Sequence, residues 1–315
     1  MCKALRMSST DSASSADASA FQQARLGLFH RYGLDASVEW LEGPNGRRTA
    51  AVVGGSGETT LLVHGAISDA AEWVLVAPRL EGRVVAVDWP GCGLTPATNI
   101  REIGVRRFAV EWLDSVVDAL GGGPVRIIGS SSGGYFGLMY ALANPDKVDR
   151  LVQVGSLPGL TSGSPFIFRL FATPLIGRVV LGQQPKGAEA NRKQVFSKLV
   201  ADADRIPADL LEADLRATAL RGAARNAHEF CRALVSPLTG LRSQNRIGDD
   251  ELRSLAVPTR FLWGSEDNFV DYADVADRLE VADAVTTEIV DGGGHLMTVE
   301  VPDLVAQLAN SFLGS

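Results

Sequence analysis

A serine flanked by glycines follows a short apolar run and is the residue best placed to act as a nucleophile. Residues 125–128 are mostly apolar and β-branched, which predicts a buried strand. The run leads into Gly129-x-Ser131-x-Gly133, and residues 134–143 then predict a helix that stops before a proline. A strand, sharp turn and helix of this kind expose a hydroxyl above the edge of a sheet. Of three consecutive serines, only Ser131 has glycines two positions before and after it.

A nucleophilic serine needs a base to accept its proton, an acid to orient that base and N–H donors for the oxyanion. The chain has four histidines. We select His295 as the base, because three glycines precede it in the loop after the last predicted strand. His30 and His228 lie in predicted helical stretches, and we expect His228 to be solvated. His64 stands at a strand end before a glycine, where it shapes the turn.

Two acidic residues follow the predicted strand that ends at Gly264. Successive side chains point in different directions, so only one of Glu266 and Asp267 can face His295. We select Asp267 as the acid, leave Glu266 in solvent and expect Asp271 to cap a short helix nearby.

Strands and helices alternate along most of the chain. This alternation predicts right-handed crossovers and a mainly parallel sheet with helices on both faces. The predicted strands are residues 38–41 and 48–53, joined by a turn as a hairpin, then 60–64, 84–88, 125–128, 148–154, 257–263 and 284–290; the helices include residues 21–32, 105–120, 208–220, 223–234 and 301–312.

The chain divides into a tail, a core and an insertion. Residues 1–20 are mostly small and polar without the apolar centre of a secretory signal, and we expect a disordered tail. Residues 21–156 and 247–315 carry the sheet pattern and form one α/β domain. Residues 157–246 are rich in Pro, Gly, Arg and Ala with helical patches, which predicts a helical cap, or lid, inserted into that domain.

Composition narrows the class of protein. The net charge of −7 and the lack of a basic run argue against nucleic-acid binding. No stretch reaches the roughly 20 apolar residues of a membrane span. Three scattered cysteines without a C-x-x-C argue against disulfides and a zinc site and favour reduced thiols in a cytoplasmic protein. We interpret Cys92 as a small filler in a glycine-rich loop rather than as a reactive thiol.

The chain resembles the α/β-hydrolase fold superfamily, in its branch of capped serine esterases, C–C hydrolases and dehalogenase-like proteins. The resemblance covers roughly residues 36–314 and rests on five short motifs in the order of that family. These are His64-Gly65, Asp88-x-x-Gly91-x-Gly93, the nucleophile elbow at 129–133, Trp263-Gly264-x-x-Asp267 and Gly294-His295. Ser130 and Asn268 depart from residues common in relatives, which weakens assignment to a subfamily.

The resemblance implies a fold and a site. The fold is an eight-stranded, mainly parallel sheet with helices on both faces and a helical cap. The site is a catalytic triad of Ser131, His295 and Asp267, with the backbone N–H groups of Ala66 and Ser132 as the oxyanion hole. A serine rather than an aspartate at position 131 argues against haloalkane dehalogenase or epoxide hydrolase chemistry.

The expected function is a serine hydrolase of the carboxylic ester type, which cleaves a small, largely apolar acyl substrate through an acyl-enzyme without a metal or organic cofactor. The same residues could hydrolyse a C–C bond, a lactone or a thioester, or perform perhydrolysis. A ligand receptor on the same fold is the alternative from another class. The oligomeric state, homo-oligomers included, stays open.

The predicted cap leaves two further interpretations open. Its apolar stretches at residues 165–171 and 174–181 either cover a greasy pocket or pack the cap onto the core. It also carries thirteen basic against seven acidic residues in an acidic chain. That excess either steers anionic substrates or belongs to an ordinary solvated surface.

Overall fold

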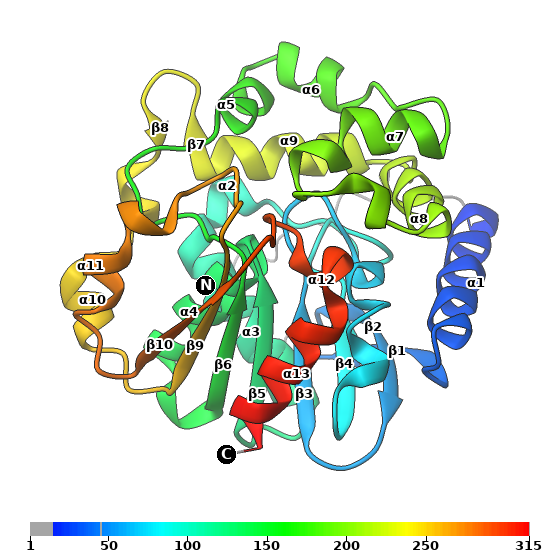
Figure 1. Ribbon diagram of the computed structural model, residues 1–315. Coiled ribbons are helices and arrows are strands. Elements are labelled where there is room, and N and C mark those ends of the chain that lie inside the picture. Colours follow the sequence, from blue (N-terminus) through cyan, green and yellow to red (C-terminus); the bar gives the residue numbers. More distant parts are fainter. Residues whose placement is uncertain (1–14, 45, 315) are drawn as a thin grey trace, which may run out of the picture.

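An eight-stranded sheet runs through the computed structural model, which describes residues 15–44 and 46–314 (Figure 1). Its strand order is β1-β2-β4-β3-β5-β6-β9-β10; β2 pairs antiparallel with both of its neighbours and the other described pairs in the sheet are parallel. The strands are β1 (Ala36–Glu42), β2 (Arg48–Gly55), β3 (Thr59–Val63), β4 (Arg83–Val87), β5 (Val125–Ser130), β6 (Val148–Val154), β9 (Thr259–Gly264) and β10 (Val285–Val290).

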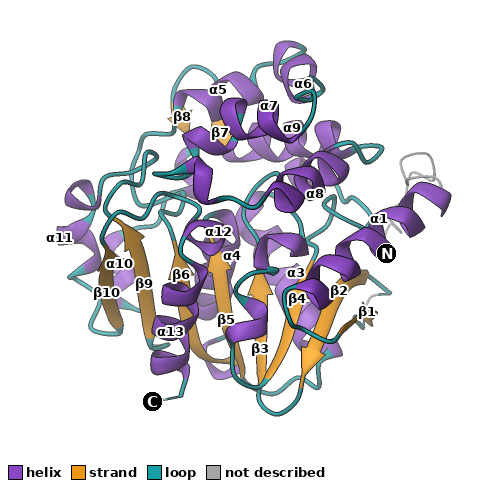
Figure 2. Ribbon diagram, turned by 45° about the vertical axis from the view of Figure 1, so that its right-hand side comes forward, coloured by secondary structure: helices purple, strands orange, loops and turns teal. Residues whose placement is uncertain are grey.

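Helices cover both faces of the sheet (Figures 1 and 2). The inner strands are buried on both sides, so successive apolar residues of β3 pack into different clusters: Leu61 and Val63 join one, and Leu62 joins the other. The first cluster includes α3 (Val105–Ala119) and α4 (Ser132–Ala143), and the second includes α1 (Ser15–Arg31) and α13 (Pro302–Leu313). The short helices are α2 (Ile100–Ile103), α10 (Asp249–Arg253), α11 (Ala276–Leu279) and α12 (Met297–Glu300).

The predicted sheet is confirmed, and one predicted boundary is wrong. The hairpin of β1 and β2 and the parallel strands lie where the patterns place them, to within a few residues. Helix α1, however, begins at Ser15, so residues 15–20 of the predicted disordered tail are helical. Small residues such as Ala and Ser do not oppose a helix once its apolar side chains Leu28 and Phe29 are buried against the core. Residues 1–14 of that tail lie outside the described part.

A mostly helical segment connects β6 to β9 and lies over the carboxyl ends of the parallel strands (Figure 2). We call residues 157–246 the helical segment; its use as a cap, with these bounds, stays a prediction. It contains the hairpin of β7 (Val235–Ser236) and β8 (Gly240–Leu241) and the helices α5 (Phe166–Ala172), α6 (Ile176–Leu181), α7 (Ala188–Gln194), α8 (Ala208–Thr218) and α9 (Ala223–Leu234).

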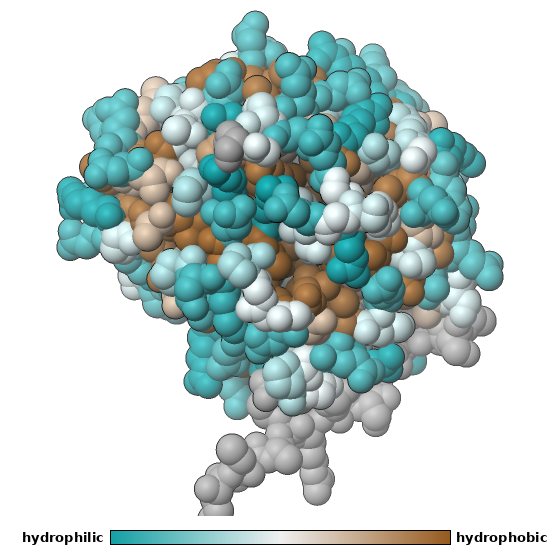
Figure 3. All heavy atoms as spheres, turned by 90° about the horizontal axis from the view of Figure 1, so that it is seen from below, coloured by the Kyte–Doolittle hydropathy of each residue, from teal (hydrophilic) through white to brown (hydrophobic). Residues whose placement is uncertain are grey.

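The opposite face of the molecule is mixed in polarity. Seen from below, hydrophilic residues lie mainly at its rim, with hydrophobic residues visible between them (Figure 3). No helix between residues 15 and 314 combines the length and apolar character needed to cross a bilayer.

Within the helical segment, a buried amide joins α7 to α8. The Asn191 side chain donates to the Leu211 carbonyl (3.0 Å) and to Asp214 Oδ2 (2.9 Å). Burial raises the pKa of Asp214 to about 6, although the hydrogen bond from Asn191 opposes this. The folded protein therefore binds this proton more tightly than the unfolded chain does.

This raised pKa predicts a pH-dependent stability. The free energy of unfolding falls as pH rises from about 4 to about 6, because the folded state then loses a proton that it holds more tightly. Asp214→Asn keeps an acceptor for Asn191 without a charge. We expect it to raise the free energy of unfolding by about 1 kcal/mol at pH 8 and to change it little at pH 4, measured by urea denaturation. Glu212→Gln, at an exposed position of the same helix, is the control. An equal gain at both pH values would contradict the assignment.

Candidate active site

Ser131 sits in a strained turn between β5 and α4. Its backbone has φ 48° and ψ −115°, in a region that residues with a side chain rarely adopt. A Cβ at Gly133 would lie 2.1 Å from the Val63 carbonyl oxygen, and a Cβ at Gly129 would lie 2.4 Å from Gly134 Cα. The two glycines of the motif are therefore required because backbone packs directly on backbone.

His295 and Asp267 form a hydrogen-bonded, buried pair. His295 Nδ1 lies 2.9 Å from Asp267 Oδ2. The same oxygen accepts from the Ser156 N–H (2.8 Å), and Oδ1 accepts from the Phe269 N–H (2.9 Å). Burial acts to raise the pKa of Asp267, but the nearby His295 and the donated hydrogen bonds outweigh it and hold that pKa below its ordinary value. Asp267 is therefore an ionised acceptor at neutral pH.

The ionised carboxylate fixes the tautomer of the histidine. A carboxylate only accepts hydrogen bonds, so Nδ1 of His295 carries a proton, and the neutral form of the ring therefore has its lone pair on Nε2. Ser131 and the His295 ring both border the end of β6: the Ser131 N–H donates to the Val154 carbonyl (3.0 Å), and Ser156 Oγ lies 3.2 Å from His295 Nδ1. Among the described residues no hydrogen bond joins the Ser131 hydroxyl to His295, and such bonds are often long before substrate binds.

The loop before His295 is fixed to the helical segment. Gly292 has φ 65°, and a Cβ at Gly294 would lie 2.5 Å from a backbone nitrogen of that segment. Glu300, itself buried, accepts from the Gly294 N–H (2.8 Å) through one oxygen and from the Asp202 N–H (2.7 Å) through the other. A single carboxylate thus ties the histidine loop to the segment above it.

An aromatic contact covers the histidine ring. The Phe269 ring centroid lies 4.2 Å from that of His295, and Phe168 of α5 packs edge-on against Phe269 at 5.6 Å. Sequence reasoning did not select Phe269, Ser156 or Glu300. The only signal was position, since Ser156 lies just past a strand end and Phe269 two residues after the selected acid.

One predicted oxyanion donor, Ser132, directly follows the strained serine, and the other, Ala66, belongs to the loop after β3. Ser132 is the first residue of α4, so its N–H has no carbonyl partner within the helix. The Ala66 N–H donates no hydrogen bond within the described residues, and Ile67 beside it has φ 60°. A Cβ at Gly65 would lie 3.5 Å from Ser131 Cβ, so the loop after β3 packs against the serine turn.

A cavity of about 740 Å³ opens at these residues. Ser131 and Asp267 line it, together with Phe168 and other apolar side chains of the helical segment. Asp271 and Asp274 add two further carboxylates, and no lysine or arginine is among the described residues that line it. The cavity can therefore hold a small organic molecule, and the part of its wall that the structure describes offers no lysine or arginine to an anionic one.

Two other histidines, His64 and His228, make hydrogen bonds with backbone groups. His64 is fully buried, with Nδ1 2.7 Å from the Gly65 carbonyl and Nε2 accepting from the Trp89 N–H (3.3 Å). Burial lowers the pKa of His64, which keeps it neutral. The expectation that His228 is solvated is wrong: only 5% of it is exposed, and Nε2 lies 3.3 Å from the Thr173 carbonyl. Helix α9, which carries His228, contacts both α5 and α6.

Three further predictions for residues near the site agree with the geometry. Glu266 is exposed, and Asp271 caps a short 3₁₀ helix by accepting from the Ala273 N–H (3.0 Å), both as expected. Burial raises the pKa of the Cys92 thiol well above its usual value, which fits the interpretation as a filler.

The chain matches a known family over most of its length. Residues 60–308 match the alpha/beta hydrolase family. A 2-hydroxy-6-oxononadienedioate/2-hydroxy-6-oxononatrienedioate hydrolase of Cupriavidus pinatubonensis is 29% identical over 227 residues, which cover 69% of this chain and 73% of that protein.

Solved structures show the same fold. Carboxylesterase CesB of Bacillus subtilis superposes with a TM-score of 0.75 at 21% identity, covering 95% of this chain and 99% of the esterase. The meta-cleavage product hydrolase CumD of Pseudomonas fluorescens gives 0.70 at 21% identity, covering 88% and 97%. With the family match over residues 60–308, the conclusion is that this chain belongs to the alpha/beta hydrolase family.

Proposed function

We propose that this protein is a serine hydrolase that cleaves an acyl bond of a small molecule through a covalent acyl-enzyme. The observation that carries the proposal is the buried His295–Asp267 hydrogen bond beside the strained Ser131, at one edge of the sheet. The triad itself is part of the proposal. The helical segment acts as a cap over this site.

The reaction proceeds in two balanced halves. Ser131 Oγ attacks the carbonyl carbon while His295 Nε2 takes the hydroxyl proton, and the N–H groups of Ala66 and Ser132 hold the oxyanion. The bond to the leaving group breaks, and the leaving group takes the proton from His295. Water then attacks the acyl-enzyme and gives a proton to the same nitrogen. The bond from the carbonyl carbon to Ser131 Oγ breaks, and Oγ takes that proton from His295, which releases the acid and the free Ser131 hydroxyl. Asp267 holds the ring orientation and stabilises its cation throughout.

Among acyl bonds, a carbon–carbon bond beside a ketone is the first candidate. The Cupriavidus relative is named for a 6-oxo acid, and hydrolysis at a ketone breaks a carbon–carbon bond. The leaving carbon must then depart with an electron pair that conjugation in the substrate stabilises. Such a leaving group also needs the proton that His295 has taken from Ser131.

Ester cleavage is the second candidate, favoured by the charge of the cavity. The relative's dioate substrate carries two carboxylates, whereas the described wall of this cavity has Asp271 and Asp274 and no lysine or arginine. Desolvating a dianion there is unfavourable. We therefore propose an uncharged substrate, or one with fewer carboxylates than that of the relative.

Removing the nucleophile tests the covalent step. Ser131→Ala should lower kcat by about 10⁴–10⁶-fold, because no oxygen remains to form the acyl-enzyme. Turnover of p-nitrophenyl butanoate and of 2-hydroxy-6-oxo-2,4-heptadienoate is measured, together with adduct formation by a fluorophosphonate. Ser130→Ala, which removes a buried hydroxyl without a partner among the described residues, should stay active. A wild type that neither turns over nor labels would favour a ligand receptor.

The choice of acid is tested at the two neighbouring acidic positions. Asp267→Asn should lower kcat by about 10⁴-fold, because an amide favours the wrong tautomer of His295. Glu266→Gln should retain activity, since Glu266 is exposed. The measurement is steady-state kinetics of the two variants and the wild type, after their melting temperatures have been shown to be equal. A larger loss from Glu266→Gln than from Asp267→Asn would show that the acid is misassigned.

The charge of the cavity predicts a substrate preference. The wild type should have a higher kcat/KM for 2-hydroxy-6-oxo-2,4-heptadienoate, which carries one carboxylate, than for 2-hydroxy-6-oxononadienedioate, which carries two. Asp271→Asn combined with Asp274→Asn should raise kcat/KM for the dioate by about 3–10-fold, because two repulsive charges are removed. Asp277→Asn, exposed and outside the cavity lining, is the control. A wild-type preference for the dianion, unchanged by the double substitution, would contradict this account.

A further inference from the structure

The loop that carries Ala66 needs support, because it contains a strained residue. Ile67 has φ 60°, which a β-branched side chain rarely adopts, so the surrounding contacts must hold it. At the start of the loop the Gly65 N–H donates to Glu72 Oε2 at 3.0 Å. Glu72 is only 6% exposed, so this contact is shielded from water.

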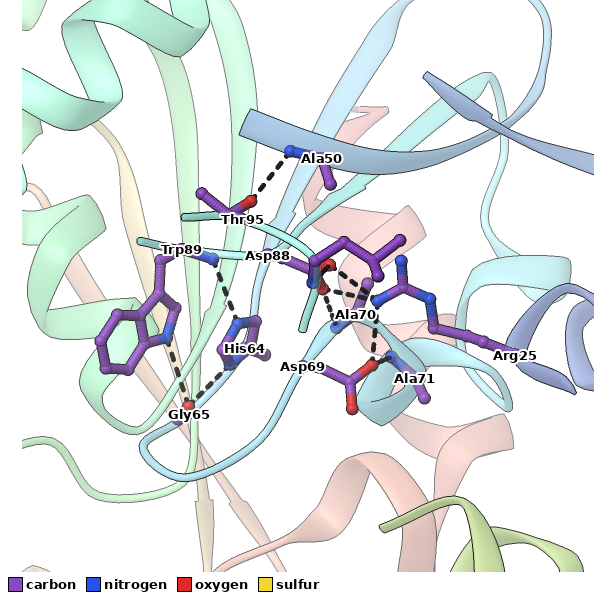
Figure 4. A network of polar contacts seen from close by, with 11 residues as sticks. Arg25, Ala50, His64, Gly65, Asp69, Ala70, Ala71, Asp88, Trp89 and Thr95 are labelled. Carbon is purple, nitrogen blue, oxygen red and sulfur yellow. Dashed lines mark hydrogen bonds and ion pairs between the residues drawn. The ribbon is translucent and has the colours of Figure 1, made fainter. Parts of the chain in front are cut away.

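Two more buried carboxylates hold the same loop where it enters the 3₁₀ helix Ala70–Trp73 (Figure 4). Asp69 Oδ1 accepts from the Ala71 N–H at 2.9 Å and caps that helix. Asp88, at the end of β4, accepts from the Ala70 N–H at 2.9 Å. Both acids are almost fully buried, at 3% and 0% exposure.

A single cation from a distant helix pairs with both acids. Arg25 of α1 places Nη1 2.7 and 2.8 Å from the two oxygens of Asp88, and 3.2 Å from Asp69 Oδ1 (Figure 4). Arg25 is 2% exposed. Two buried carboxylates without a counterion would repel each other and remain poorly solvated, so their positions depend on this arginine.

We propose that Arg25 is a positioning residue for the oxyanion hole. By pairing with Asp69 and Asp88 it keeps the loop after β3 in the strained shape that directs the Ala66 N–H at the reacting carbonyl. It also balances negative charge that would oppose an oxyanion forming beside the loop. The inference rests on the proposed function, because it assigns Ala66 a role only in a serine hydrolase.

A purely structural role for Arg25 predicts a different outcome. Helix α1 is also held by buried Leu28 and Phe29 and by the exposed pair of Arg31 with Asp209. If Arg25 only anchored the helix, its loss would lower stability and leave each folded molecule fully active. A positioning role requires that kcat per folded molecule falls while KM changes little.

The experiment compares Arg25→Met and Arg25→Lys with the wild type, using the ester substrate and a fluorophosphonate that counts reactive serines. For Arg25→Met we expect kcat per labelled serine to fall about 10–100-fold with KM within threefold, since a displaced oxyanion donor acts in the transition state. Arg25→Lys keeps the charge and should recover part of that loss. Arg31→Met should retain wild-type kcat and KM.

Each outcome separates the hypotheses. Wild-type kcat per labelled serine in Arg25→Met, with only a lower melting temperature, would overturn the positioning role. If Arg25→Met does not fold, Arg25→Lys decides alone: a fall in kcat of about threefold or more at full labelling supports the proposal, and unchanged kcat overturns it. A wild type that neither labels nor turns over would instead count against the proposed function, and the inference would end with it.

Discussion

The turn around Ser131 depends on polypeptide backbones that approach each other more closely than any side chain allows. Gly129 and Gly133 touch backbone atoms of α4 and β3, and this contact supports the positive φ of the serine. A turn held in this way needs the neighbouring strand and helix to be fully packed. The parallel strands around it end at the same edge, so the loops after β3, β6, β9 and β10 meet there. Residues far apart in the chain therefore share one site.

Buried carboxylates hold the loops at this edge. Asp267, Glu300, Glu72 and Asp88 each accept a hydrogen bond from at least one backbone N–H of a loop. An ionised acceptor makes stronger hydrogen bonds than a neutral one, and a buried one is shielded from competing water. A buried carboxylate is costly unless a cation balances its charge. Arg25 provides that cation for Asp69 and Asp88, although it lies on α1, far from both of them in the sequence.

Much of the fold could be predicted from the sequence, because its signals are local. The β-branched runs, the glycine spacing around Ser131 and each of the five short motifs are all read within a few residues. The contact of Arg25 with Asp69 and Asp88 is not local: it joins positions 44 and 63 residues apart, and nothing in α1 marks that arginine. The prediction that His228 is solvated was wrong for the same reason, since its burial depends on α5 and α6, which are distant from it in the sequence.

The acid was predicted on weaker grounds than the serine. Glu266 and Asp267 differ by one position at a strand end, and only the three-dimensional turn determines that the Ser156 and Phe269 N–H groups reach Asp267. The start of α1 was missed because the sequence before Phe21 is small and polar. Tertiary burial further along the helix outweighs that local composition.

The contact of Phe168 with Phe269, and of Phe269 with His295, has a consequence for access by solvent. The Phe269 ring covers one face of the His295 imidazole, and Phe269 is itself in contact with Phe168 of α5. An outward displacement of α5 would also move Phe168 away from Phe269, and the Phe269 ring would then lose the contact that holds it against His295. The same movement of α5 would therefore admit a bulky ligand and expose the His295 ring to water. The size of the bound ligand thus also determines how much water reaches that ring.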